Sequence, residues 1–71
     1  MRRYLKANLG RTVVVQCHKL AFRGVLISAR DDALELSSAA ILDEDNPRQG
    51  WIQADGVVFV AAPQVRFVQV V

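Results

Sequence analysis

The chain has 71 residues, of which 52% are hydrophobic, and its formal net charge is +2. This length allows one domain, residues 1–71, and the lone Cys and lone His exclude an internal disulfide and a structural zinc site, so oligomerisation is the remaining source of stability. No apolar run reaches the roughly 18 residues of a membrane span, and no secretory signal is recognised, so we expect a soluble cytoplasmic protein without cofactors and without membrane contact.

Basic and acidic residues are separated along the chain. Residues 1–30 hold seven basic side chains and no acid, whereas residues 31–71 hold all seven acids and two Arg. This split predicts one basic and one acidic surface, and the basic surface would attract a polyanion such as nucleic acid. The alternative is that complementary charges meet across subunits.

A short basic helix is predicted over residues 2–9. Its apolar side holds Tyr4, Leu5 and Leu9, and the rest of its surface holds Arg2, Arg3 and Lys6. Gly10 follows the last apolar position, where a helix commonly ends in the left-handed conformation. Because eight residues are too few for a stable isolated helix, this segment must pack on the remainder of the chain.

Two strands joined by a hairpin are predicted next, over residues 12–17 and 20–29. Val13, Val15 and Cys17 would share one face of the first strand, so Cys17 is expected to be a small core residue rather than a reactive one. The second strand contains Gly24, and a Gly inside a strand indicates a bulge, a sharp bend or a close backbone approach. Such a bend is how a small sheet curls into a barrel.

The second half of the chain continues with strands and turns. An acidic turn, residues 30–32, leads to a third strand over 34–42, and residues 43–50 form a polar loop. Residues 51–62 resume strand character, interrupted at Asp55 and Gly56 by a bulge or a separate turn. Residues 61–64 connect to a final strand over 65–71. Trp51 is expected to be a lid on the core or an interface anchor, in preference to a platform for base stacking.

The order of these elements, together with two motifs, resembles the Sm-like family. The first motif corresponds to Gly24-Val25-Leu26, with Asp31 seven positions after the Gly and Leu34-Glu35-Leu36 beyond it. Residues 58–68, Val-Phe-Val-Ala-Ala-Pro-Gln-Val-Arg-Phe-Val, resemble the second motif. The resemblance covers nearly the whole chain and implies a mostly β fold, in which a short N-terminal helix precedes a five-stranded, strongly bent Sm-like (SH3-like) barrel. The compact form and unusual turns suit a divergent bacterial or phage-type member.

The resemblance also implies where RNA would bind. In relatives that bind uridine-rich RNA, the acidic turn and the turn of the second motif meet at the pore of a ring and hold one base per subunit. Their counterparts here are Asp31, Asp32, Ala61 and Ala62. The first turn lacks the Asn of those relatives and the second lacks their Arg-Gly, so we expect weak or absent uridine-specific binding.

The leading functional hypothesis is a closed homo-oligomeric ring, formed by strand pairing between subunits, that binds single-stranded RNA. The basic side chains expected to contact phosphates are Arg2, Arg3, Lys6 and Arg11. One alternative is an assembly or scaffold module that keeps the ring without RNA recognition, and another is a monomeric SH3-like barrel with a protein partner. No catalytic constellation, Gly-rich phosphate loop or metal-ligand cluster is recognised, so we expect no enzyme, no catalytic residue and no metal.

Overall fold

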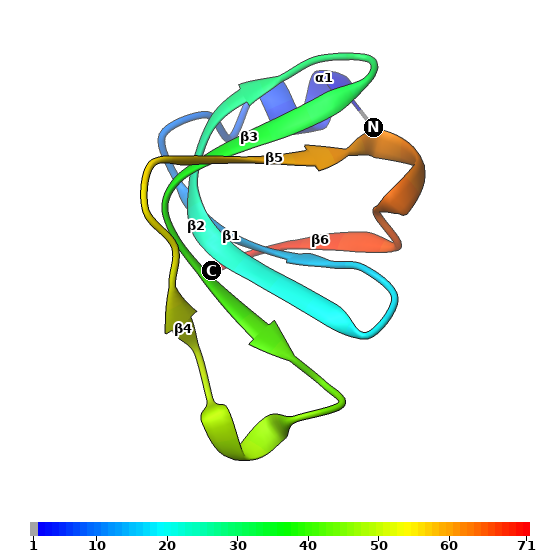
Figure 1. The fold of residues 1–71 in the computed structure, drawn as a ribbon. Helices are drawn as coiled ribbons and strands as arrows, with labels where there is room; N and C mark the ends of the chain where they lie inside the picture. Colours follow the sequence, from blue (N-terminus) through cyan, green and yellow to red (C-terminus); the bar gives the residue numbers. More distant parts are fainter. Residues whose placement is uncertain (1) are drawn as a thin grey trace.

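The computed structural model describes residues 2–71, and of Arg2 it describes the backbone alone. In this part of the chain six strands form one curled antiparallel sheet, with a short helix at one end and the loop after β3 at the other (Figure 1). The elements are α1 (Arg2–Lys6), β1 (Thr12–Gln16), β2 (Leu20–Ala29), β3 (Ala33–Asp43), the 3-10 helix η1 (Pro47–Gln49), β4 (Ile52–Gln53), β5 (Val57–Ala61), the 3-10 helix η2 (Ala62–Gln64) and β6 (Phe67–Val70). The strands follow the order β4-β3-β2-β1-β6, and β5 pairs with the first half of β3. The prediction of a mostly β chain with a short helix and a bent sheet is confirmed.

The core lies inside the curl of the sheet. Its largest fully buried side chains come from alternate positions of β1 and from the middle of β2 and β3: Val13, Val15, Leu26 and Leu36. This alternation is the consequence of strand geometry, in which successive side chains point to opposite faces. Cys17 continues the buried face of β1, as predicted, and is 5% exposed.

The hairpin between β1 and β2 forms at His18 and Lys19, as predicted. The backbone N–H of Cys17 donates to the carbonyl oxygen of Leu20 over 2.8 Å, which closes the turn. Lys19 occupies the left-handed region with φ 63°, a backbone conformation that residues other than Gly rarely adopt. Burial of Cys17 and Ala21 on either side of the turn holds this backbone in place.

Two register shifts bend β2 and β3. Between Arg23 and Val25 of β2, the opposite strand β3 contains one extra residue, so Ser38 bulges outward with φ 50°. Between Leu26 and Ser28 the extra residue belongs to β2 instead. Because each bulge increases the local twist, the pair of long strands curls around the core.

The helix is shorter than the predicted span of residues 2–9. It ends at Lys6, and only Leu5 is buried, whereas Leu9 is 45% exposed. Gly10 has φ 87°, as predicted for the end of the helical segment, and its N–H donates to the carbonyl oxygen of Leu26 over 2.7 Å. A second hydrogen bond runs from the N–H of Leu26 to the carbonyl oxygen of Arg11. Because these two bonds hold residues 10 and 11 against β2, the chain turns away from the helix axis before Leu9, and Leu9 does not share the buried face of Leu5.

The interruption predicted at Asp55 and Gly56 is a separate turn, and it divides residues 51–62 into two strands. β4 pairs with Ala40 and Ile41 of β3, whereas β5 pairs with residues 33–37, and the chain turns between them at Gly56 with φ 73°. The division follows from the bulge at Ser38, because a partner strand must change direction where β3 does. No helix in the described residues is long and apolar enough to cross a membrane.

Candidate functional site

The structure brings together the two turns that the sequence analysis assigned to a pore. Ala33 at the start of β3 is paired with Ala61 at the end of β5. Next to this pair, the backbone N–H of Ala62 donates to the carbonyl oxygen of Asp32 over 2.9 Å. The β2–β3 turn and the junction of β5 with η2 therefore lie side by side at one end of the sheet (Figure 1). Asp31 and Asp32 are both exposed there, beside Ala61 and Ala62.

Arg30 adds a cation to these turns that the sequence analysis did not assign to them. Its Nη2 lies 3.3 Å from Oε2 of Glu35, and its Nε lies 3.9 Å from Oδ1 of Asp32. Arg30 directly precedes Asp31 and Asp32 in the sequence, and this adjacency would have sufficed to predict that its guanidinium lies beside the acidic turn. Asp31, Asp32 and Glu35 together carry three negative charges against the one positive charge of Arg30, so the turns keep a negative balance. The described residues contain no group of three His, Cys, Asp or Glu side chains that would hold a metal ion.

Arg3 and Lys6 of α1 and Arg11 after it are exposed. Arg3, Lys6 and Arg11 make no ion pair with a described carboxylate, so their charges are available to a ligand. The side chain of Arg2, the fourth predicted member of this group, lies outside the described residues. These four basic residues, Arg2, Arg3, Lys6 and Arg11, are called the basic lead-in below.

The predicted division into one basic and one acidic surface is only partial. Lys19 Nζ lies 3.8 Å from Oδ2 of Asp45, which joins the β1–β2 hairpin to the acidic loop after β3. Glu44 of the same loop accepts a hydrogen bond from Nε2 of Gln16 over 3.1 Å. The separation of basic and acidic residues along the chain did not predict these contacts. They form because the curled sheet brings the acidic loop back to the hairpin. Arg3, Lys6 and Arg11 of the basic lead-in, together with Arg23 of β2, stay exposed and without an ion pair to a described carboxylate.

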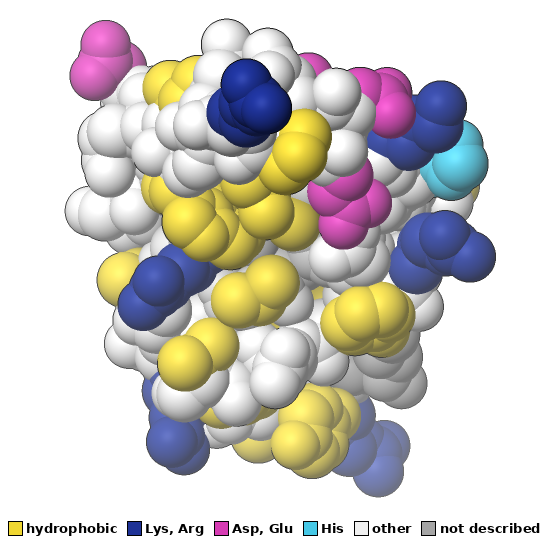
Figure 2. Space-filling model, turned by 90° about the horizontal axis from the view of Figure 1, so that it is seen from below, with side chains coloured by type: hydrophobic (Ala, Val, Ile, Leu, Met, Phe, Trp, Pro, Cys, Tyr) yellow, Lys and Arg dark blue, Asp and Glu magenta, His cyan; other side chains and the backbone are white. Residues whose placement is uncertain are grey.

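Two strands present an edge and an apolar side to solvent. Within residues 2–71, β5 pairs only with β3 and β6 pairs only with β1, so each has a second edge without a partner. Phe59 of β5 is 61% exposed and Phe67 of β6 is 55% exposed. Figure 2 shows hydrophobic side chains spread over the face seen from below in Figure 1, with Lys and Arg as well as Asp and Glu side chains around them. Beside β5, an apolar hollow of about 290 Å³ is lined by side chains that include Leu20, Phe22 and Phe59.

Cys17 has the environment of a structural residue. It forms no disulfide, and burial raises the pKa of its thiol. A raised pKa keeps the sulfur protonated and therefore a poor nucleophile at neutral pH. This agrees with the predicted core role.

Comparisons with known proteins place the fold. No protein-family model matches the sequence, and no curated protein is similar to it at a significant level. An Sm protein of Pyrococcus abyssii, solved in complex with a uridine heptamer, is 17% identical with a TM-score of 0.79, over 97% of this chain and 94% of that chain. A heptameric archaeal Sm protein is 24% identical with a TM-score of 0.79, over 97% of this chain and 97% of that chain. Both likenesses span the whole barrel rather than one hairpin.

Proposed function

Because the chain has the Sm-like fold, we propose that it assembles into a closed homo-oligomeric ring and that this ring binds single-stranded RNA. The observation that carries the proposal is the pair of unpartnered edges on β5 and β6, each with an exposed Phe. Of the two solved Sm proteins named above, one is heptameric and the other was solved with a uridine heptamer, which supports both halves of the proposal.

The proposed assembly pairs β5 of one subunit with β6 of the next. Unpaired strand edges with apolar side chains attract other strands, and pairing them with each other removes the hazard of uncontrolled aggregation. Such a contact is head-to-tail, so it must close into a ring or grow into a fibre. Phe59 and Phe67 would lose their exposure at each junction, and this burial is the main stabilising contribution.

RNA binding would use the basic lead-in. A ring repeats Arg3, Lys6 and Arg11 around its axis, so a single strand meets several copies of the same cations. Linked contacts of this kind raise the overall affinity far above that of one subunit. Because each contact with a phosphate releases counterions, the affinity should fall steeply with salt.

The two turns at Asp32 and Ala62 are proposed to lie at the pore, as in the resemblance described above. Carboxylates there repel phosphate, and the methyl groups of Ala61 and Ala62 offer nothing to stack on a base or read its edge. We therefore propose that RNA lies on the side of the basic lead-in and that uridine is not strongly preferred. The acidic turns also favour a second candidate, a ring that serves as an assembly module and binds no RNA.

The first test is the mass of the purified protein by light scattering, with and without nuclease treatment. We expect a discrete multiple of the 7.9 kDa chain that carries nuclease-sensitive material. A stable monomer at micromolar concentration would exclude the ring. A ring free of RNA that also fails to bind added oligonucleotides would support the assembly module. We place this ring in the cytoplasm, whose reducing conditions suit a lone buried thiol.

The second test compares oligouridine with oligoadenosine of equal length at one salt concentration, and repeats the comparison with Asp31→Asn. We expect similar, salt-sensitive affinities for both oligonucleotides, and at most a modest gain for the variant because one like charge per subunit has been removed. A strong oligouridine preference that collapses in Asp31→Asn would show that the pore turns read uridine.

A further inference from the structure

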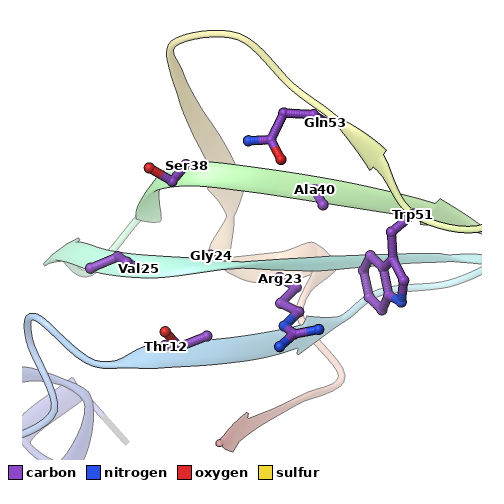
Figure 3. A pocket seen from close by; sticks show the side chains of 8 residues that line it. All are labelled: Thr12, Arg23, Gly24, Val25, Ser38, Ala40, Trp51 and Gln53. Carbon is purple, nitrogen blue, oxygen red and sulfur yellow. The ribbon is translucent and has the colours of Figure 1, made fainter.

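The outward face of the sheet contains a second hollow, of about 390 Å³, at the other half of β3 (Figure 3). It is of the size of small-molecule sites. Its side chains come from four strands and from the residue before β4: Thr12, Arg23, Val25, Ser38, Trp51 and Gln53. None of these residues is among those that the sequence analysis assigned to RNA.

The floor of the hollow is shaped by the bend of the sheet. Gly24 contributes no side chain, and β3 lies so close that an added Cβ would be 2.9 Å from the carbonyl oxygen of Ser37. Opposite it, Ser38 is held at φ 50°, a conformation that costs free energy for a residue other than Gly. Bulges of this kind occur often beside binding sites, where they redirect side chains.

The charge of the hollow is positive. Arg23 is its only charged lining residue, is exposed, and makes no ion pair with any described carboxylate. The other polar groups are the hydroxyls of Thr12 and Ser38 and the amide of Gln53. A guanidinium without a protein partner is well suited to a phosphate, which it can hold through two parallel hydrogen bonds.

Trp51 supplies an aromatic surface to the same hollow. Its side chain is 41% exposed and it is absent from the core cluster, so it is not a lid on the core, and its other predicted role, as an interface anchor, stays a prediction. Figure 3 shows its indole beside β2, on the side of the strands from which Arg23 and Gln53 also project. An exposed aromatic ring on a sheet, next to a cation and an amide, is the chemistry by which single-stranded RNA is held: bases stack on the ring and phosphates meet the cation.

We propose that this hollow is a separate RNA subsite in which one nucleobase stacks on Trp51 and the adjoining phosphate binds Arg23, while the Gln53 amide contacts the edge of the base. The inference rests on the proposed RNA-binding function and extends it to residues outside the pore turns and the basic lead-in. Thr12 of the hollow directly follows Arg11 of the basic lead-in in the chain, so one oligonucleotide could contact both regions.

The chain offers a direct probe of this site, because Trp51 is its only Trp. The experiment titrates the intact protein with short oligoadenosine while recording Trp fluorescence and, separately, the anisotropy of a labelled oligonucleotide. Stacking of a base on the indole should quench the fluorescence along the same curve as the anisotropy. Inorganic polyphosphate serves as the control, since it presents phosphates without bases and should not quench by stacking.

Variants identify the two partners. Trp51→Ala should weaken oligonucleotide binding by about tenfold, and Trp51→Phe, which keeps a ring, by less. Arg23→Gln should weaken binding and reduce its salt dependence, whereas Arg23→Lys should retain part of both. Light scattering on each variant checks that the ring mass is unchanged.

The outcomes separate this subsite from the function on which it rests. Normal RNA binding without Trp quenching, and with all four variants unaffected, would overturn the subsite and leave RNA binding intact. A changed ring mass in Trp51→Ala and Trp51→Phe would overturn it as well, because Trp51 would then be an anchor between subunits. Absence of binding to any oligonucleotide would overturn both the function and the subsite.

Discussion

At Gly24 the backbone of β2 approaches β3 more closely than a side chain would permit. A Cβ built there would lie 2.9 Å from the carbonyl oxygen of Ser37 and 3.1 Å from Cα of Ala39. Both neighbours are backbone atoms in the middle of a strand, so they cannot move aside as a flexible side chain would. The bend of the sheet at this point therefore depends on the absence of a side chain.

Gly24→Ala should lower the free energy of unfolding by about 1 to 3 kcal/mol, the usual cost of forcing a methyl group into a packed region. Urea unfolding followed by circular dichroism measures it. Ser28→Ala on the same strand is the control and should stay within about 0.5 kcal/mol of the parent. Equal stability of Gly24→Ala and the parent would mean that the strands separate easily, contrary to the close approach described here.

Cys17 gives a prediction of pH dependence. Burial raises the pKa of its thiol, so above the ordinary thiol pKa the unfolded chain releases this proton while the folded chain keeps it. The free energy of unfolding should therefore fall as pH rises through that range. Cys17→Ala should remove this part of the decline. A thiol reagent should modify Cys17 slowly in the native protein and fast in urea; equally fast modification in both would contradict the burial.

The basic lead-in depends on how α1 is held on the sheet. α1 is too short to be stable by itself, and the burial of Leu5 and the two backbone bonds to Leu26 fix it on the sheet. The side chains of Arg3 and Lys6 are exposed and take no part in the core, which suits them to a ligand.

Replacing Arg2, Arg3 and Lys6 together by Gln should weaken RNA binding for all sequences, because phosphate contacts carry no base information. The salt dependence should flatten, by about 0.7 in the logarithmic slope for each phosphate that the variant no longer neutralises. Filter binding at several salt concentrations measures both. Lys19→Gln, in the β1–β2 hairpin and already paired with Asp45, is the control and should have little effect. Unchanged affinity in the triple variant would assign these cations to contacts between subunits.

At the scale of the whole molecule, Phe67 tests the proposed ring. Phe67→Asp places a carboxylate where β6 should meet its neighbour, and burying an unpaired charge costs roughly several kcal/mol. The variant should dissociate to smaller species or lose its fold, which light scattering and circular dichroism distinguish. Leu9→Asp, an apolar residue of similar exposure outside the edge strands, should keep the ring. A Phe67→Asp ring of normal mass would contradict the proposed pairing.

Much of the fold followed from local patterns in the sequence. Alternation of apolar residues predicted β1 and the burial of Val13, Val15 and Cys17, and the β-branched run with its Gly predicted the bounds of β2 and its bend. These features depend on neighbours a few residues away, whose geometry is fixed by strand periodicity and the conformations available to Gly. The Sm-like order of helix, bent strand and acidic turn was likewise predicted from local patterns, within residues 2–32.

What only the tertiary structure decided were the contacts between distant segments. The pairing of β4 and β5 with different halves of β3 follows from a bulge in β3, and the pairing of Lys19 with Asp45 follows from the curl of the sheet. The hollow that joins Arg23 to Trp51 has the same origin, since 28 positions separate them in the chain. Sequence patterns predict on which face of its own strand a side chain lies. The bend of the sheet determines which residues of different strands become neighbours.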